Sequence, residues 1–159
     1  HHEVVGARMT KKILKGLKYD NKTIEDIALL VEQHLRPHTF KMGWTDSAVR
    51  RYIVDAGHML EDLNELVRAD VTTKNKIKAK EIYLDLEEME KRIEEVKAKE
   101  ELSKIRPALS GDEIMEHFNI QPGPKVGVIM KALYEQRIND GEVSKEDALK
   151  LAEETYKNL

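Results

Sequence analysis

Apolar residues recur every three or four positions along most of this chain, which is the spacing of one face of an α-helix. The chain has no strand-like run of β-branched residues. The pattern therefore predicts an all-α protein. Helices are expected over residues 2–17, 24–36, 46–56, 59–71, 74–102, 111–118 and 125–139, and from residue 145 onward.

Capping and helix-breaking residues indicate where several of these helices begin and end. Thr23, with Asp26 three residues later, has the spacing of a capping box and is expected to open the second helix. Pro37 ends that helix, because proline cannot continue the hydrogen-bond ladder. Residues 39–44 are then expected to form a loop, and Thr45 to cap the helix that follows.

The same signals recur near the C-terminus. Ser110 with Glu113 forms a second capping box, and Ser144 with Asp147 caps the last helix. Asn119 stands where a left-handed helix end favours glycine, and asparagine is the next best residue there.

The longest predicted helix, residues 74–102, carries one narrow apolar stripe on an otherwise charged surface. The stripe alternates by four and three, as in packed helices: Ile82, Leu86, Met89, Ile93 and Val96. Packing against the chain's own bundle is the favoured interpretation, because the stripe spans barely three heptads. An intermolecular coiled coil is the alternative.

Residues 105–109, Ile-Arg-Pro-Ala-Leu, break the helical pattern and mark the expected domain boundary. We predict a helical region over residues 1–103, which includes the long helix, and a small C-terminal helical region over residues 104–159. A chain of 159 residues is long enough for one or two domains with real cores.

Composition narrows the function classes. The net charge is −3, from 27 basic and 30 acidic residues, so no global basic field indicates nucleic acid. Cysteine is absent, which excludes disulfides, a thiolate metal site and a cysteine nucleophile. No apolar run approaches membrane-spanning length and no signal peptide is recognisable, so we expect a soluble, cytoplasmic protein.

Four residues have the chemistry of a divalent-metal site: His2, His34, His38 and Asp70. Ligands spread over three helices converge only if those helices pack side by side. A hydrogen-bonded histidine is the commoner role on an amphipathic helix, and His1-His2 also resembles the stub of a purification tag. Spacing alone therefore favours a structural role over metal binding.

An arginine pair is a candidate for binding phosphate. Arg50 and Arg51 stand near Trp44 and Tyr52, a combination that suits a phosphate contact with a base stacked beside it. A solvated arginine pair with a packed tryptophan fits the same residues equally well.

Two further basic segments allow the same two interpretations. Lys125 follows the loop at residues 120–124 and opens a helix, whose free N–H groups attract anions. A tight turn between packed helices needs the same residues and is the favoured interpretation. The run Lys74, Lys76, Lys78 and Lys80 is a possible phosphate track, although such a run is usually a solvated helix face.

Several motifs, in the same order, resemble the C-terminal half of CCA-adding tRNA nucleotidyltransferases and related poly(A) polymerases, in the branch with an HD phosphohydrolase-like domain. The motifs are Val-Val-Gly-Ala-Arg-Met at 4–9, His-Leu-Arg-x-His at 34–38, Gly-Trp-Thr-Asp-Ser-Ala-Val-Arg-Arg at 43–51, Arg-Ala-Asp-x-Thr-Thr-Lys-Asn at 68–75, Ile-Arg-Pro-x-Leu-x-Gly at 105–111 and Pro-Gly-Pro-x-Val-Gly at 122–127. The resemblance covers nearly the whole chain. It implies a partial HD-type helical bundle, then a long helix and a small C-terminal helical domain.

The resemblance implies an enzyme that adds C, C and A to tRNA 3′ ends from CTP and ATP, with Mg²⁺ on a palm domain. That palm needs a Gly-rich strand–turn motif and paired aspartates, and this sequence contains neither. We therefore expect the catalytic residues, with CTP and ATP, to lie in a domain outside this chain. The HD centre is also expected to be incomplete. His2, His34, His38 and Asp70 match its later ligands, and the earlier ones would precede His1.

In this family the C-terminal helical region holds the tRNA body, so tRNA is the expected partner. The candidate RNA contacts carried over are Arg50, Arg51, Lys74, Lys125 and Arg137. The alternatives are a metal-dependent HD-type phosphohydrolase segment and a helical scaffold that dimerises through residues 82–96. The sequence distinguishes neither CCA from A-only addition nor one oligomeric state from another.

Overall fold

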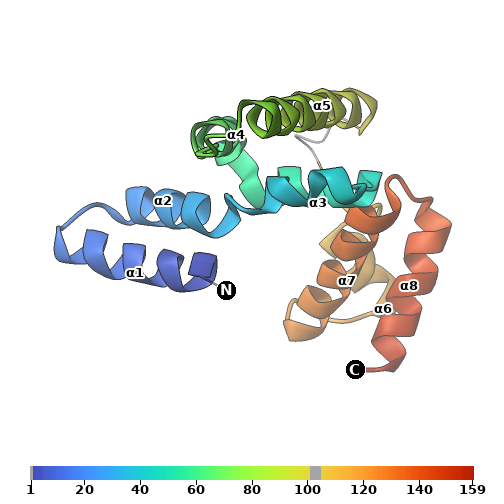
Figure 1. The fold of residues 1–159 in the computed structure, drawn as a ribbon. Coiled ribbons are helices and arrows are strands. Elements are labelled where there is room, and N and C mark those ends of the chain that lie inside the picture. The colour runs from blue at the N-terminus through green and yellow to red at the C-terminus, as the bar shows by residue number, and fades with distance from the viewer. Residues whose placement is uncertain (1, 101–104) are drawn as a thin grey trace. The chain divides into compact units, whose positions relative to one another are not determined.

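The computed structural model describes residues 2–100 and 105–159 (Figure 1). These residues form helices and loops without a strand, which confirms the all-α class. The α-helices are α1 (His2–Gly16), α2 (Asn21–Gln33), α3 (Asp46–Ala56), α4 (Leu60–Ala69), α5 (Lys76–Glu100), α6 (Gly111–Phe118), α7 (Pro124–Asp140) and α8 (Lys145–Lys157). Two 3₁₀ segments are η1 (Arg36–Met42) and η2 (Gly57–Met59).

The chain divides into two compact units. Unit 1 holds the described residues up to Thr45 together with Tyr52–Glu94, and unit 2 holds Asp46–Arg51 with the described residues from Glu95 onward. The division falls inside α3 and α5. The predicted end of the long helix at Leu102 and the predicted domain boundary after residue 103 lie outside the described residues, so the domain assignment stays a prediction.

In unit 1, helices α1 and α2 pack along each other (Figure 1). Ala7 of α1 and Ile24 and Ala28 of α2 are buried. A Cβ atom at Gly6 would lie 3.1 Å from Cγ1 of Val31, so glycine at this position permits the close approach of the two helices.

Helices α4 and α5 of unit 1 are joined by an ion pair. Arg68 donates from Nε and Nη2 to the two carboxylate oxygens of Glu90, at 3.0 and 2.6 Å. On α5, Leu86, Met89 and Ile93 of the apolar stripe are at most 3% exposed. The chain itself therefore covers these positions, which confirms the intramolecular interpretation of the stripe.

Unit 2 has its own core between α6, α7 and α8. The buried residues are Leu109, Ile114, Ile129, Leu133, Ala148 and Ala152. Three of the local predictions here are confirmed. Ser110 and Glu113 form a reciprocal capping box, the Ser144 side chain accepts from the Asp147 N–H, and Asn119 is left-handed with φ 50°.

The predicted start of the second helix is wrong. Asp20 is the N-cap: its Oδ1 accepts from the Thr23 N–H at 3.0 Å and its Oδ2 from the Thr23 hydroxyl at 2.6 Å. Aspartate is an equally good capping residue three positions earlier, so the helix begins at Asn21.

The segment after α2 also differs from the prediction. The helix ends at Gln33, before Pro37, and the proline instead occupies the first turn of η1, where its missing N–H costs nothing. The expected loop at residues 39–44 is therefore largely the second half of this 3₁₀ segment. Among the described helices, none is both long enough and apolar enough to cross a membrane.

The capping box of α6 is tied to α8 through Glu113. The Lys145 ammonium donates to Oε1 of Glu113 at 2.6 Å, and the Ser110 N–H donates to Oε2 at 2.7 Å. These bonds, led by that from Lys145, lower the pKa of Glu113 from its ordinary 4.5 to about 2.

We predict an acid-dependent loss of stability that requires Glu113. Its lowered pKa means that the folded chain binds fewer protons than the unfolded chain between pH 4.5 and 2. The stabilisation is therefore complete above about pH 4.5 and is lost as the pH falls toward 2. Melting temperatures measured by circular dichroism from pH 6 to 2 should decline less steeply for Glu113→Gln than for the wild type.

The matched control is Glu116→Gln, a change at an exposed position on the same helix. It should keep the wild-type pH profile. A Glu113→Gln profile parallel to that of the wild type over the whole range would contradict the prediction.

Candidate functional site

Three of the four predicted metal ligands each have a separate local environment. His34 follows α2, and its Nδ1 lies 2.7 Å from the carbonyl oxygen of Val31. The His2 side chain is 78% exposed near Glu3, and Asp70 is the exposed C-cap of α4. Each of these side chains therefore has a local role at a helix end or at the surface.

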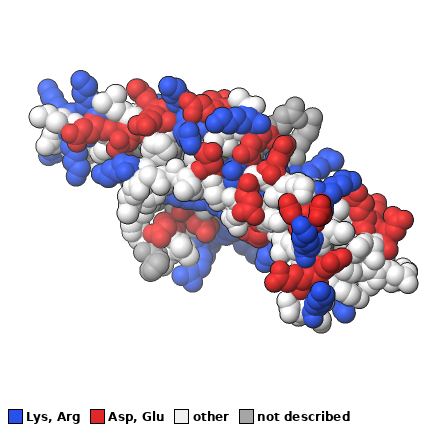
Figure 2. Space-filling model, turned by 90° about the vertical axis from the view of Figure 1, so that its right-hand side faces the viewer, with Lys and Arg blue, Asp and Glu red and all other residues white. Residues whose placement is uncertain are grey.

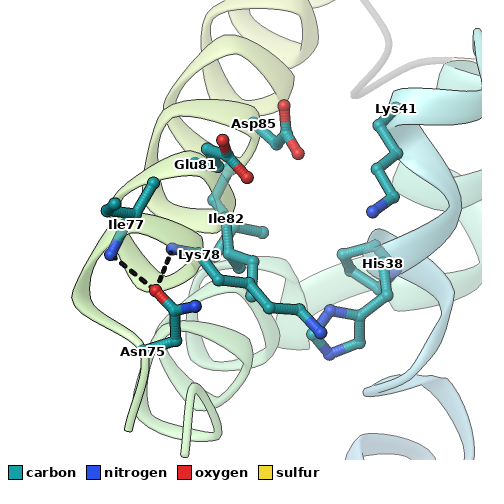
Figure 3. Close-up of a pocket in the computed structure, with 10 residues that line it drawn as sticks. His38, Lys41, Asn75, Ile77, Lys78, Glu81, Ile82 and Asp85 are labelled. Carbon is teal, nitrogen blue, oxygen red and sulfur yellow. Dashed lines mark hydrogen bonds between the residues drawn. The ribbon is translucent and has the colours of Figure 1, made fainter. Parts of the chain in front are cut away.

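The fourth predicted ligand, His38, lies in a pocket of unit 1 between η1 and the start of α5 (Figure 3). Lys41 and Lys78 line the same pocket, and two ammonium groups disfavour a divalent cation. Over residues 2–100 and 105–159, no three His, Asp or Glu side chains are grouped so that they could hold a metal ion. The arrangement does not fit the predicted HD-type metal centre.

Two of the predicted RNA-binding arginines are buried in unit 2. Arg50 and Arg137 are 7% and 6% exposed. Both donate to Glu100: Arg50 from Nε to Oε1 at 2.9 Å, and Arg137 from Nη1 to Oε2 at 3.2 Å. Nη1 of Arg50 also donates to the carbonyl oxygens of Ile138 and Asn139, at 2.6 and 3.1 Å. We call Arg50, Glu100 and Arg137 the buried charge cluster.

A glycine makes room for the buried charge cluster. Gly141 ends α7 with φ 81°, and a Cβ atom there would lie 3.2 Å from Nη2 of Arg50. The backbone conformation therefore favours glycine, and a side chain here would also press on the buried Arg50 guanidinium. Neither Glu100 nor Gly141 is predicted by the sequence, because a glutamate on a charged helix and a glycine in a turn carry no local sign of a buried partner.

Arg51 is the arginine of the pair that reaches the surface, with its side chain 30% exposed. Its Nη1 donates to Oε1 of Glu135 at 3.1 Å and its Nη2 to Oε2, so the pair is bidentate. The guanidinium lowers the pKa of Glu135 by donating these bonds. An RNA phosphate at this position would have to compete with that carboxylate.

The aromatic residues near the arginine pair are packed in unit 1. Tyr52 is fully buried and its hydroxyl donates to Oδ1 of Asn64 at 2.9 Å. The Trp44 ring lies 5.2 Å from the Tyr52 ring, and its Nε1 donates to the Thr39 hydroxyl at 3.0 Å. Tyr52 is thus a core residue with no face open to a nucleotide base. The contacts of Trp44 agree with the interpretation in which this tryptophan packs against the protein.

The two predicted lysine contacts are exposed. Lys74 lies in the loop before α5, and Lys125 lies in the first turn of α7. The Lys125 ammonium is 5.2 Å from the centre of the Tyr156 ring, a cation–π distance. Within the described part of the chain, neither lysine has an acidic partner at ion-pair distance. Both charges are therefore available to an anion.

Opposite charges are mixed on one face of the molecule. On the face drawn in Figure 2, lysine and arginine side chains stand among aspartate and glutamate side chains, without a broad area of one sign on its described part. On this face, contact with a polyanion would depend on individual exposed cations and not on a general positive field.

Comparison with known proteins gives the family. A family profile for tRNA nucleotidyltransferase domain 2 matches residues 4–152. The CC-adding tRNA nucleotidyltransferase of Thermus thermophilus is 31% identical over 147 residues, which are 92% of this chain and 31% of the relative. The A-adding tRNA nucleotidyltransferase of Deinococcus radiodurans is 30% identical over 141 residues, with 86% of this chain and 30% of the relative covered.

The chain spans less than a third of the length of these curated relatives. No solved structure matches it. Since the profile covers most of the chain, and both relatives bear the same family name, the chain belongs to the tRNA nucleotidyltransferase family, as its domain 2.

Proposed function

We propose that this chain is the tRNA-holding region of an enzyme that transfers CMP or AMP from CTP or ATP to tRNA 3′ ends, with Mg²⁺ in a catalytic domain. The observation that carries the proposal is the family match over residues 4–152. The relatives' names, CC-adding and A-adding, support a nucleotidyl-transfer role for the whole protein without deciding which nucleotide it adds.

Binding would depend on the shape and phosphates of the tRNA rather than on its sequence. Helical RNA offers proteins its phosphates and 2′-hydroxyls, and cations that neutralise phosphates supply the affinity. Of the predicted contacts, we propose Lys74 and Lys125 as direct phosphate ligands because they are exposed and carry no carboxylate partner. Arg51 is a secondary contact that must first leave Glu135.

Arg50 and Arg137 serve the same function indirectly. Their donors are engaged with Glu100 and with the α7 carbonyls, so we propose that they hold α7 and the end of α5 in place rather than bind RNA. The partial HD-type bundle remains our proposal for residues 1–103, on the sequence motifs alone. Its metal chemistry is not part of the proposal, because the four side chains do not fit a metal centre.

Neutralising the exposed lysines is expected to weaken tRNA binding. Lys74→Gln with Lys125→Gln should lower the affinity at low salt and reduce the slope of log K against log salt by about 1 per lysine. Titration of labelled tRNA at several salt concentrations measures both quantities. Lys150→Gln is the matched control, because Glu146 and Asp147 already neutralise that ammonium. A double variant with the wild-type slope would exclude these two lysines as phosphate contacts.

A further inference from the structure

The pocket in unit 1 has the size and lining of a small-molecule site that the proposed function does not use. It encloses about 750 Å³, within the usual range for ligand sites. η1 contributes Pro37, His38 and Lys41 to its wall. The loop before α5 and the first three turns of α5 form the rest of the lining, which includes Lys78, Glu81, Ile82, Asp85 and Leu86.

Both signs of charge line this pocket, and α5 contributes groups of each sign. His38 and Lys41 project from η1, and Glu81 and Asp85 project from α5 across the gap (Figure 3). Lys78 extends along the base of the pocket toward the His38 ring (Figure 3). Lys41 and Lys78 thus offer anion-binding groups to a ligand, and Glu81 and Asp85 offer cation- or amine-binding groups to the same ligand.

The charged groups of the pocket are not neutralised by one another. In the described part of the chain, no ion pair joins Lys41 or Lys78 to Glu81 or Asp85, although both signs line one cavity. The α5 N-terminus itself is already occupied, since Oδ1 of Asn75 accepts from the N–H groups of Ile77 and Lys78, at 3.0 and 3.2 Å. Side chains, and not the helix end, therefore supply the binding groups.

A nucleotide combines the groups that such a lining recognises. Ammonium groups bind a phosphate, carboxylates accept hydrogen bonds from the exocyclic amine of cytosine, adenine or guanine, and aliphatic side chains cover a base face. Uracil has no exocyclic amine. Pro37 of η1 and Ile82 and Leu86 of α5 supply the apolar part of the lining.

We propose that this pocket holds one unstacked, amine-bearing nucleotide of the bound RNA, with its phosphate on Lys41 and Lys78 and its base amine on Glu81 or Asp85. The inference rests on the proposed function for the source of the nucleotide. A free phosphate alone would leave the two carboxylates without a role.

The test uses the 159-residue chain and free 5′-monophosphates as probes. In ¹⁵N NMR titrations, AMP, CMP and GMP should shift the amide signals of residues 75–86, with dissociation constants at least 10-fold lower than that of UMP. Glu81→Gln with Asp85→Asn should reduce this preference to less than 3-fold. Lys41→Gln with Lys78→Gln should weaken all four nucleotides together. Inorganic phosphate, tested alone, should bind more weakly than AMP.

Matched controls lie on the same helix outside the pocket. Lys80→Gln and Glu88→Gln remove one charge each from exposed positions of α5 and should leave nucleotide binding unchanged. The proposal is overturned if no nucleotide shifts residues 75–86, if UMP binds as well as AMP, or if inorganic phosphate accounts for all the affinity.

Parallel tRNA titrations separate this inference from the proposed function. If the wild type binds tRNA with salt dependence but the nucleotides leave the pocket signals unchanged, the pocket proposal fails and the proposed function stands. If the nucleotides bind the pocket but tRNA does not bind the chain, the proposed function fails, and the pocket's assignment to bound RNA fails with it.

Discussion

Replacing Glu100 with alanine is expected to lower the free energy of unfolding by about 3–5 kcal/mol, the usual cost of removing one partner from a buried ion pair. Glu100 is 16% exposed and accepts from both Arg50 and Arg137. Without it, two guanidinium groups remain buried near each other with no carboxylate, and each loses a charge-assisted hydrogen bond. Urea unfolding followed by circular dichroism at pH 7 measures the change.

The control for this prediction is Glu88→Ala, an exposed position on the same helix. It tests the effect of removing a glutamate from α5 without disturbing the buried charge cluster, and we expect a change within about 0.5 kcal/mol. A loss of less than about 1 kcal/mol for Glu100→Ala would contradict the prediction that the buried charge cluster stabilises the fold.

Replacing Leu133 with alanine is the second change with a large expected effect, a loss of about 2–5 kcal/mol. Leu133 is 1% exposed in the core between α6, α7 and α8. The truncation removes buried apolar area and leaves a cavity that surrounding helices fill only in part. The same urea experiment measures it.

Val128→Ala, on the same helix, is the matched control for Leu133→Ala. Val128 is 45% exposed, so its truncation removes little buried surface and should change stability by about 0.5 kcal/mol or less. Equal losses for the two variants would contradict the placement of the unit 2 core on this face of α7.

Local signals in the sequence predicted much of the fold. The Ser110–Glu113 box and the left-handed Asn119 depend on residues within a few positions of each other, and the structure confirms both. The error at Thr23 arose from the same local rule, because Asp20 is a second capping residue within one turn and it binds the Thr23 N–H and hydroxyl. The periodicity of apolar residues thus predicts where a helix lies, and the choice between neighbouring capping residues determines the residue at which it begins.

Long-range pairing explains what could not be predicted about the candidate site. In the sequence, Arg50 and Arg137 are indistinguishable from arginines that bind phosphate at a surface. Their partner Glu100 lies 50 and 37 residues away along the chain. Nothing in the neighbourhood of either arginine indicates that carboxylate. The same holds for His38, because the residues across the pocket from it come from α5 and the loop before that helix.

The buried charge cluster also changes how RNA binding should be tested. Substitution of Arg50 or Arg137 would weaken binding through loss of structure, and would therefore imitate the loss of a phosphate contact. Lys74 and Lys125 are exposed and can be neutralised without that complication. Their variants distinguish a lost phosphate contact from a misfolded unit.

The central claim is that this chain holds tRNA through phosphate contacts. The most direct test is the affinity of the wild-type chain for tRNA, measured over salt concentrations from about 50 to 200 mM. We predict that log K falls linearly with log salt, with a slope set by the number of phosphates contacted. The absence of binding at low salt, or an affinity that does not change with salt, would contradict the claim.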